Sequence, residues 1–251
     1  MTTLISPVDA TTTAQLVMSD AAIVDAAVVD ARTAFLTHRR ASTAARIGWL
    51  ELAARAVESI EDVVVRSLMR DIGKPRRAAV FEAKRAAQFI RACATQLPHL
   101  YGEVLPLDIT APGAGRFGFT TRVPYGVVGA ITPFNAPINL LVQKLAPALA
   151  VGNATVVKPS PPGTPVALIL AEAFKTAGLP DGLFNVVPGG AETARALAAH
   201  PLVSVLTLTG STEAGHDLAR AAGAKKFVAE LGSNAANIVC ADADLSDAAT
   251  R

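Results

Sequence analysis

Two side chains near the end of this 251-residue sequence have the chemistry of a base and a nucleophile. Glu230 and Cys240 lie ten residues apart, with a glycine turn at Gly232 between them. A carboxylate at the end of an apolar strand suits general-base catalysis, and a thiolate attacks electrophilic carbon. The spacing leaves both roles open, and it also allows one of the two residues to be a bystander.

Asn135 lies in the segment TPFNAP (132–137), where Pro133 and Pro137 restrict the backbone. A side-chain amide that is held in one direction can donate a hydrogen bond to an oxyanion. The alternative interpretation is an Asx turn that precedes a helix.

Lys158 is the one charged residue in the segment VVKPSPPGTP (156–165), which follows an apolar strand. Its ammonium group could bind ribose hydroxyls or a phosphate. The alternative is a lysine that only extends its charged end to water.

Glycine turns precede two of the expected helices. Gly210, with Ser211 and Thr212, opens a helix whose free N–H groups and dipole favour a pyrophosphate. This segment is not a GxGxxG fingerprint, and by itself it is a weak motif. Gly190, in VVPGG (186–190), provides a second turn on the side expected for adenosine. Glu230 also has an alternative interpretation, a strand end that faces solvent.

Alternating strands and helices must position these residues. Apolar strands are expected at 126–132, 153–158, 183–187, 203–209, 225–231 and 237–240. Helices are expected between them at about 136–150, 164–177, 191–199 and 213–222. Continuously apolar strands that alternate with helices predict a parallel sheet covered on both faces. Such sheets bind ligands at the carboxyl ends of their strands, where the polar residues lie.

The first hundred residues are predicted to be helical. The expected helices cover 19–38, 43–71 as one helix or two, and 79–97. Gly73 suits a left-handed helix end, and Pro75 blocks continuation. Cys93 lies among alanines on the last of these helices and is expected to be a buried, inert thiol. Two strands, 103–109 and 115–126, are expected around the turn TAPGAG (110–115).

The composition predicts a globular protein, because 51% of the residues are hydrophobic and 18% are charged. The formal net charge of +2 and the absence of a basic run argue against a nucleic-acid partner. No signal peptide and no apolar run of membrane length is found, which predicts a cytoplasmic protein without a membrane partner. Two cysteines and four scattered histidines give neither a disulfide framework nor a metal site.

Five short motifs together resemble the aldehyde dehydrogenase superfamily, from about Ala21 to the C-terminus. In the family's order and spacing they are Gly73-Lys74-Pro75, Pro133-Phe134-Asn135, Lys158-Pro159-Ser160, Thr209-Gly210-Ser211-Thr212 and Glu230-Leu231-Gly232. The resemblance implies an α/β fold, with N-terminal helices, a Rossmann-variant parallel sheet and part of a bridging hairpin. It implies that 1–102 is the helical segment of the cofactor-binding domain, 103–125 the oligomerisation hairpin and 126–251 the NAD(P)-binding sheet.

The resemblance also implies a reaction, the NAD(P)-dependent oxidation of an aldehyde to a carboxylic acid. In the family a cysteine thiolate attacks the aldehyde, and an Asn side chain and a backbone N–H hold the thiohemiacetal oxyanion. Hydride passes to the nicotinamide, and a Glu activates the water that hydrolyses the thioester. Asn135 and Glu230 match these catalytic positions. The implied cofactor contacts are Ile131, Thr132, Pro133, Phe134, Lys158, Ser160, Gly190, Thr209, Gly210, Ser211, Leu231 and Gly232.

The sequence departs from the family pattern in two places. Pro161 stands where NAD-preferring members often carry a Glu that binds the ribose, so NADP is expected to be accepted as well as NAD. The family's nucleophile lies roughly thirty-five residues after the Glu, near position 265, which is past Arg251 and far from Cys240. We therefore expect an N-terminal half that lacks the catalytic domain and is inactive alone, with Cys240 as a structural thiol.

Two other functions stay open. One is a cofactor-binding or interaction module without catalysis. The other is a CoA-acylating aldehyde dehydrogenase, which Glu230 disfavours because those relatives generally lack this base. The complete protein is expected to act on a small aldehyde as a homo-oligomer, a dimer or a tetramer.

Overall fold

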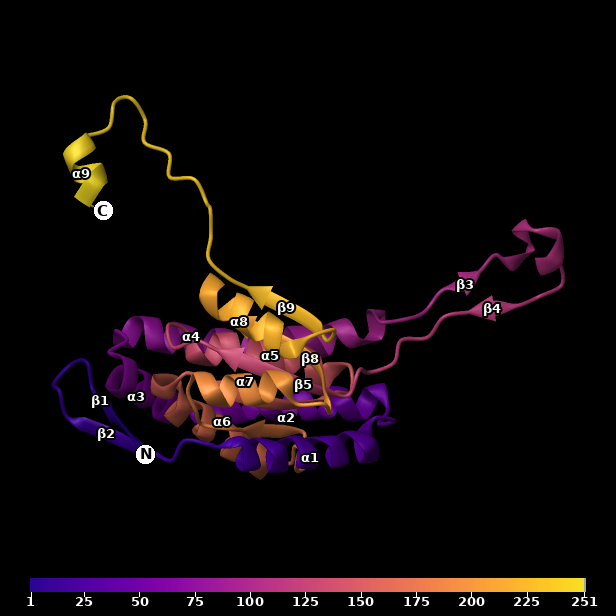
Figure 1. Ribbon diagram of the computed structural model, residues 1–251, viewed down its shortest axis with the longest axis horizontal. Helices are drawn as coiled ribbons and strands as arrows, with labels where there is room; N and C mark the ends of the chain where they lie inside the picture. The colour runs from indigo at the N-terminus through magenta and orange to yellow at the C-terminus, as the bar shows by residue number, and fades with distance from the viewer. Residues whose placement is uncertain (251) are drawn as a thin grey trace.

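A five-stranded parallel sheet forms the centre of the molecule (Figure 1). The computed structural model describes residues 1–250. The strands lie in the order β7-β6-β5-β8-β9, and each neighbouring pair is parallel. Their bounds are β5 (Val127–Thr132), β6 (Ala154–Pro159), β7 (Phe184–Val186), β8 (Val203–Thr209) and β9 (Lys226–Glu230). The predicted α/β fold with a parallel sheet is confirmed.

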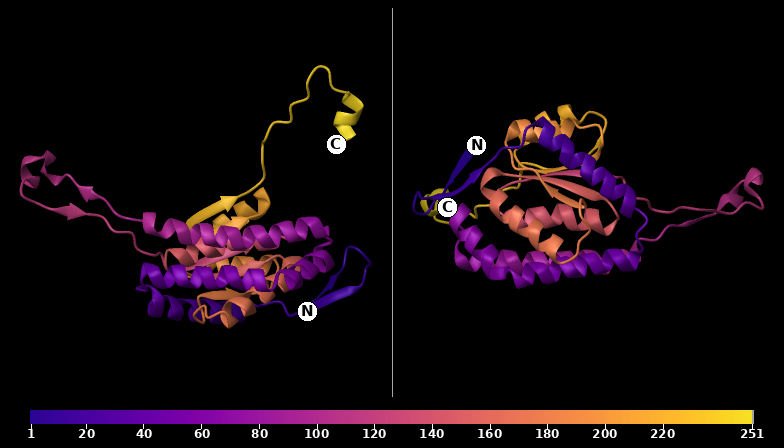
Figure 2. Two further views of the ribbon diagram at one scale, coloured as in Figure 1. Left: turned by 180° about the vertical axis from the view of Figure 1, so that it is seen from behind. Right: turned by 90° about the horizontal axis from the view of Figure 1, so that it is seen from below.

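Helices cover both faces of the sheet (Figures 1 and 2). Their bounds are α1 (Ala21–His38), α2 (Thr43–Ser59), α3 (Glu61–Ile72), α4 (Arg76–Gln96), α5 (Pro137–Ala150), α6 (Thr164–Thr176), α7 (Ala191–Ala199) and α8 (Thr212–Ala222). Helices α5 and α6 pack on one face, with α2, α3 and α4 as a further layer outside them. Helices α1 and α7 pack on the other face, and α8 packs beside α7 and β9. Within residues 1–250, no helix combines the length and the apolar character needed to cross a membrane.

The strands at the centre of the sheet are apolar because helices cover them on both sides. Every residue of β5 and of β6 is buried. The outermost strand β9 is different, because all of its residues are exposed except the half-buried Phe227. The hydrophobic core therefore centres on β5 and β6, and the sheet is open at β9.

Local capping sets the boundaries of the N-terminal helices. Asp20 accepts a hydrogen bond from the Ile23 N–H at 2.9 Å and begins α1. Ser42 begins α2 in the same way. Gly73 ends α3 with a φ of 67°, the left-handed conformation expected for this glycine. The stretch 43–71 forms two helices, which separate at Ile60.

Two hairpins differ from the sequence-based prediction. An antiparallel hairpin of β1 (Thr2–Ile5) and β2 (Thr12–Leu16) precedes α1, where no strand was expected. The hairpin after α4 has strands of only two residues, β3 (Val104–Leu105) and β4 (Gly118–Phe119), with 3₁₀ turns between them at Leu107–Ile109 and Ala111–Gly113. It projects from the body as an arm (Figure 1).

The predicted strand at 237–240 is wrong. Residues 231–240 have no regular structure and lead away from the body to the short helix α9 (Leu245–Thr250) (Figure 1). A run of four apolar residues is ambiguous without a neighbouring strand to pair with. Cys240 is therefore exposed, and it does not end a buried strand. The domain boundaries inferred from the resemblance stay predictions.

The chain reverses its direction across the sheet after β7. It runs from β5 through β6 to β7, and then returns through α7 to β8 and β9 on the other side of β5. The boundary between β5 and β8 is thus a topological switch point. Open α/β sheets bind ligands at such a point, beyond the carboxyl ends of the strands.

Candidate functional site

The residues selected from the sequence lie at the carboxyl edge of the sheet. Thr132 ends β5, and its carbonyl accepts a hydrogen bond from the Ser160 N–H, just after β6, at 2.9 Å. On the other side of the switch point, Thr209 ends β8 in register with Glu230 of β9. The Gly210 N–H donates to the Glu230 carbonyl at 3.0 Å. Main-chain bonds thus hold four of the predicted strand ends in fixed positions.

Lys158 is a buried cation at this edge, beside Ile131 in the register of β6 on β5. Its exposed fraction is 7%, and burial lowers the pKa of its ammonium group to about 8. In the part of the chain that the structure describes, no carboxylate or carbonyl oxygen accepts a hydrogen bond from it. An unpaired buried charge is costly, so the site favours a ligand that brings acceptor oxygens.

Two hydroxyl groups at the ends of β5 and β6 are also unpaired within residues 1–250. Thr132 Oγ1 and Ser160 Oγ are buried and find no hydrogen-bond partner in the part of the chain that the structure describes. The neighbouring Gly163 keeps the space small, because an added Cβ would lie 3.1 Å from Ser160 Oγ. Buried hydroxyls in proteins are normally satisfied. Lys158 and these hydroxyls are thus polar groups without partners at the ends of β5 and β6, and each could donate a hydrogen bond to an oxygen of a ligand.

The N-terminus of α8 lies across the switch point from Lys158. The Ser211 hydroxyl caps this helix and accepts from the Ala214 N–H at 3.2 Å. The remaining N–H groups of the first turn and the helix dipole favour an anion, although Glu213 in the same turn opposes it. The predicted pyrophosphate contact at Gly210 and Ser211 is compatible with this geometry and stays a prediction.

The loop after β9 packs tightly on α8. An added Cβ at Gly215 would lie 2.6 Å from the end of the Leu231 side chain, which would have to move. The Gly232 N–H donates to Thr212 Oγ1 at 3.3 Å. Leu231 and Gly232 therefore lie beside the helix start at which the anion is expected.

Gly190 is the N-cap residue of α7, in the connection that leads from β7 to this helix. A Cβ at Gly190 would meet only Met18, at 3.8 Å. A Cβ at the preceding Gly189 would lie 2.0 Å from Thr193 Oγ1, which itself donates to the Ser19 carbonyl at 2.7 Å. Of the two glycines, Gly189 is therefore the one that the packing requires.

Asn135 has an exposed side chain and a fixed main chain. Its carbonyl accepts a hydrogen bond from Lys74 Nζ at 2.7 Å. Next to it Phe134 is exposed, and Pro133 is half-buried. The loop thus holds the backbone of Asn135 and leaves its amide free to meet a ligand.

Glu230 is exposed, which agrees with the alternative interpretation of a strand end that faces solvent. The reason is that β9 is the outermost strand. Thr209 Oγ1 donates to Glu230 Oε2 at 3.4 Å. Within residues 1–250, the carboxylate therefore has the environment of a solvent-facing strand end.

Lys144 on α5 is a site residue that the sequence reasoning missed. Burial lowers the pKa of its ammonium group, and the negative charge of Glu230 partly offsets this effect. Its Nζ donates to Thr207 Oγ1 at 3.3 Å. A lysine within the apolar helix INLLVQKLAPALA was the available signal, because such a position is otherwise unfavourable for a charge.

The two thiols lie outside this edge. Cys93 is half-buried on α4, and burial raises its pKa to about 11, so it is an inert thiol. Cys240 lies on the exposed segment after β9. Among residues 1–250, no three His, Cys, Asp or Glu side chains gather in a way that could hold a metal.

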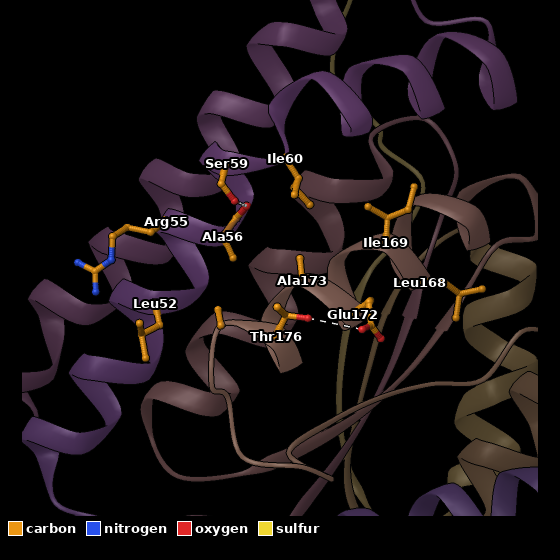
Figure 3. A pocket seen from close by; sticks show the side chains of 11 residues that line it. Leu52, Arg55, Ala56, Ser59, Ile60, Leu168, Ile169, Glu172, Ala173 and Thr176 are labelled. Atoms are coloured by element: carbon orange, nitrogen blue, oxygen red, sulfur yellow. Dashed lines mark hydrogen bonds between the residues drawn. The ribbon is translucent and has the colours of Figure 1, made fainter.

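A groove of about 780 Å³ lies elsewhere, between α2 and α6 (Figure 3). Its walls are mostly apolar and include Leu52, Leu168 and Ile169. Glu172 and Thr176 form a hydrogen bond with each other there, at 3.5 Å. None of the strand-end residues lines this groove, so it is separate from the candidate site.

Comparisons with known proteins show the family of the chain. The family model described as "Aldehyde dehydrogenase family" matches residues 1–251. A 3-sulfolactaldehyde dehydrogenase of Priestia aryabhattai is 42% identical over 200 residues, which are 79% of this chain and 42% of that protein. The chain thus spans less than half of the length of this relative.

Solved structures show the same similarity. An NADP-dependent glyceraldehyde-3-phosphate dehydrogenase from Bacillus halodurans C-125, complexed with NADP, superposes with a TM-score of 0.92 at 31% identity. The match covers 99% of this chain and 53% of that one. PnpE in complex with nicotinamide adenine dinucleotide gives a TM-score of 0.90 at 33% identity, over 99% of this chain and 51% of that one.

Lys158→Met is expected to raise the free energy of unfolding at pH 7 by about 1–3 kcal/mol, because it removes a buried, unpaired charge. The folded-state pKa of about 8 lies below the ordinary value of 10.5. Between these values the unfolded chain binds more protons, so the wild type gains stability as the pH rises. The advantage of the variant should therefore shrink from pH 7 to pH 10.

Urea unfolding at the two pH values measures this effect, and Lys84→Met, at an exposed position on α4, is the matched control. A Lys158→Met variant that is less stable than the wild type at pH 7, or one whose stability difference is the same at both pH values, contradicts the assignment of a buried cation.

Proposed function

The chain belongs to the aldehyde dehydrogenase family, and from this membership and the site geometry we propose that it forms the NAD(P)-binding part of an enzyme that oxidises an aldehyde to a carboxylic acid. Because the chain covers about half of its structural relatives, the activity, substrate and partners of the whole protein belong to this proposal. The polar groups that carry it lie on both sides of the switch point.

The observation that supports cofactor binding most strongly is the unpaired set at the ends of β5 and β6. Lys158 and Ser160 would donate hydrogen bonds to the adenosine ribose, since both lack partners in the chain itself. Because these buried donors would gain hydrogen-bond partners when the ligand binds, they would add to the affinity for the ligand. Two structural relatives are complexed with NAD or NADP, which supports this choice of ligand.

Other strand-end residues would hold the rest of the cofactor. Gly210 and Ser211 would contact the pyrophosphate at the start of α8. The remaining proposed contacts surround these groups, and they are Ile131, Thr132, Pro133, Phe134, Gly190, Thr209, Leu231 and Gly232. A bound NAD(P) would supply the hydride acceptor for the oxidation.

Two residues would act on the substrate. Asn135, whose amide is free and whose backbone is held, would donate a hydrogen bond to the oxyanion that forms when a thiolate attacks the aldehyde. Glu230 would accept a proton from the water that releases the acid.

Neither thiol of this chain is proposed as the nucleophile. Cys93 is held on α4 with a raised pKa, and Cys240 lies on a segment that leads away from the carboxyl edge (Figure 1). We therefore propose that the chain alone binds the cofactor without oxidising aldehydes. The proposal thus assigns aldehyde oxidation to the whole enzyme, and it assigns to this chain the alternative function, that of a cofactor-binding module. A CoA-acylating enzyme is the weaker alternative, because Glu230 supplies a base for hydrolysis.

The arm formed by β3 and β4 supports an oligomeric enzyme. Val104, Phe117 and Phe119 are exposed on it, at 69%, 75% and 63%. Exposed apolar side chains on a projecting hairpin are typical of a protein interface. We propose that the arm contacts another subunit in a homo-oligomer.

The enzyme that carries this chain is expected to use NADP as well as NAD. Pro161 begins a 3₁₀ turn, Pro161–Gly163, directly after Ser160, and it places no carboxylate where a 2′-phosphate would be repelled. Steady-state kinetics should give kcat/KM values for the two cofactors within about tenfold of each other. A preference for NAD of a thousandfold or more contradicts this prediction.

The 251-residue chain incubated with propionaldehyde and NAD is expected to form no NADH, because neither of its thiols is a suitable nucleophile. Absorbance at the NADH band measures the reaction. NADH formation that depends on propionaldehyde and disappears in Asn135→Ala contradicts the proposal that the chain alone is inactive.

A further inference from the structure

The loop that carries Asn135 leads into α5, and this helix lacks a capping side chain of its own. Its N-cap residue is Ala136, which has no side-chain acceptor, and its first residue is Pro137. The next two N–H groups belong to Ile138 and Asn139, which are both buried. Without a partner from elsewhere, these two donors would be unsatisfied.

Glu82 supplies the missing cap from α4. Its Oε1 accepts hydrogen bonds from the Ile138 N–H at 2.9 Å and from the Asn139 N–H at 3.2 Å. The side chain of Glu82 is only 2% exposed, and its negative charge lies at the positive end of the α5 dipole. A buried carboxylate in the outer helical layer thus fixes the start of α5.

Lys74 connects this carboxylate to the Asn135 loop. Its Nζ pairs with Glu82 Oε2 and donates a second hydrogen bond, at 2.7 Å, to the main-chain carbonyl of Asn135. Gly73, with its left-handed φ of 67°, and Pro75 fix the turn from which Lys74 extends. The lysine side chain is only 14% exposed, so neither charge is well screened by water.

We propose that Lys74 and Glu82 are positioning residues that hold the Asn135 amide in its productive direction. The two side chains fix Asn135 from both sides, through its carbonyl on one side and through the first turn of α5 on the other. Neither reaches the reacting atoms. The inference rests on the proposed role of Asn135 in oxyanion binding.

A purely structural ion pair that joins α4 to α5 is the rival explanation. It would predict equal losses whether or not Asn135 is present. A positioning role predicts coupling, because the effect of Lys74 on catalysis would then pass through the Asn135 amide.

The first experiment needs no activity and uses the 251-residue chain. Amide hydrogen exchange is measured in the wild type, Lys74→Met, Glu82→Gln and the exposed control Lys84→Met. The amides of Ile138, Asn139 and Leu140 should exchange about tenfold faster in the first two variants, and those of Val156 and Val157 in β6 should be unchanged. Wild-type exchange at Ile138 and Asn139 in both variants would overturn the proposed capping.

Faster exchange at β6 as well would indicate global destabilisation, and the comparison is then repeated with Lys74→Arg, which keeps the charge. This variant should retain the protection of Ile138 and Asn139. Loss of that protection in Lys74→Arg while β6 stays protected would count against the role of the charge.

The second experiment is a double-mutant cycle, and it uses the complete enzyme that carries this chain. Lys74→Met should lower kcat about 10- to 100-fold, with KM for the cofactor unchanged, since a displaced donor weakens binding of the transition state. In an Asn135→Ala background the same change should lower kcat less than about twofold. Equal losses in both backgrounds would overturn the positioning role, whereas an Asn135→Ala enzyme with full activity would instead refute the proposed function of Asn135.

Discussion

All five strands of the sheet run in the same direction, and the rest of the structure depends on this constraint. Parallel strands need crossover helices, which cover both faces and force β5 and β6 to be apolar. Polar side chains are then excluded from the body of the sheet and collect where the strands end. The switch point between β5 and β8 brings those ends together, which is why residues separated by a hundred positions share one edge.

Three charged residues near this edge differ in how far their charge is compensated by other groups. Glu82 is buried, but it is paired with Lys74 and with two N–H groups of α5. Lys144 is partly buried and gains some stabilisation from Glu230. Lys158 alone has neither a counter-charge nor a hydrogen-bond acceptor within residues 1–250. The pairing of Glu82 stabilises the fold. The unpaired charge of Lys158 lowers the stability of the fold and leaves its ammonium group available to a ligand.

Features that depend on short-range physical rules could be predicted from the sequence. The apolar strands β5 and β6, the left-handed end of α3 at Gly73 and the polar strand ends at Lys158 and Thr209 all follow from local patterns. These patterns also carry the family resemblance, which the family model confirms.

The remaining features depend on contacts between distant residues. The bonds from Glu82 to α5 and from Lys74 to Asn135 cross more than fifty positions, and no local pattern indicates them. The exposure of Glu230 depends on β9 being the outermost strand, which its apolar sequence does not reveal. The segment 237–240 has strand-like residues but no neighbour to pair with, so the same pattern led there to a wrong prediction.

Binding of NAD(P) at the carboxyl edge of the sheet can be measured by NADH titration of the ¹⁵N-labelled chain. If NAD(P) binds there, saturable shifts should be largest at the backbone amides of Ser160, Gly210 and Ser211, on both sides of the switch point. Shifts confined to the groove between α2 and α6, or no shifts at the carboxyl edge at saturating NADH, would contradict it.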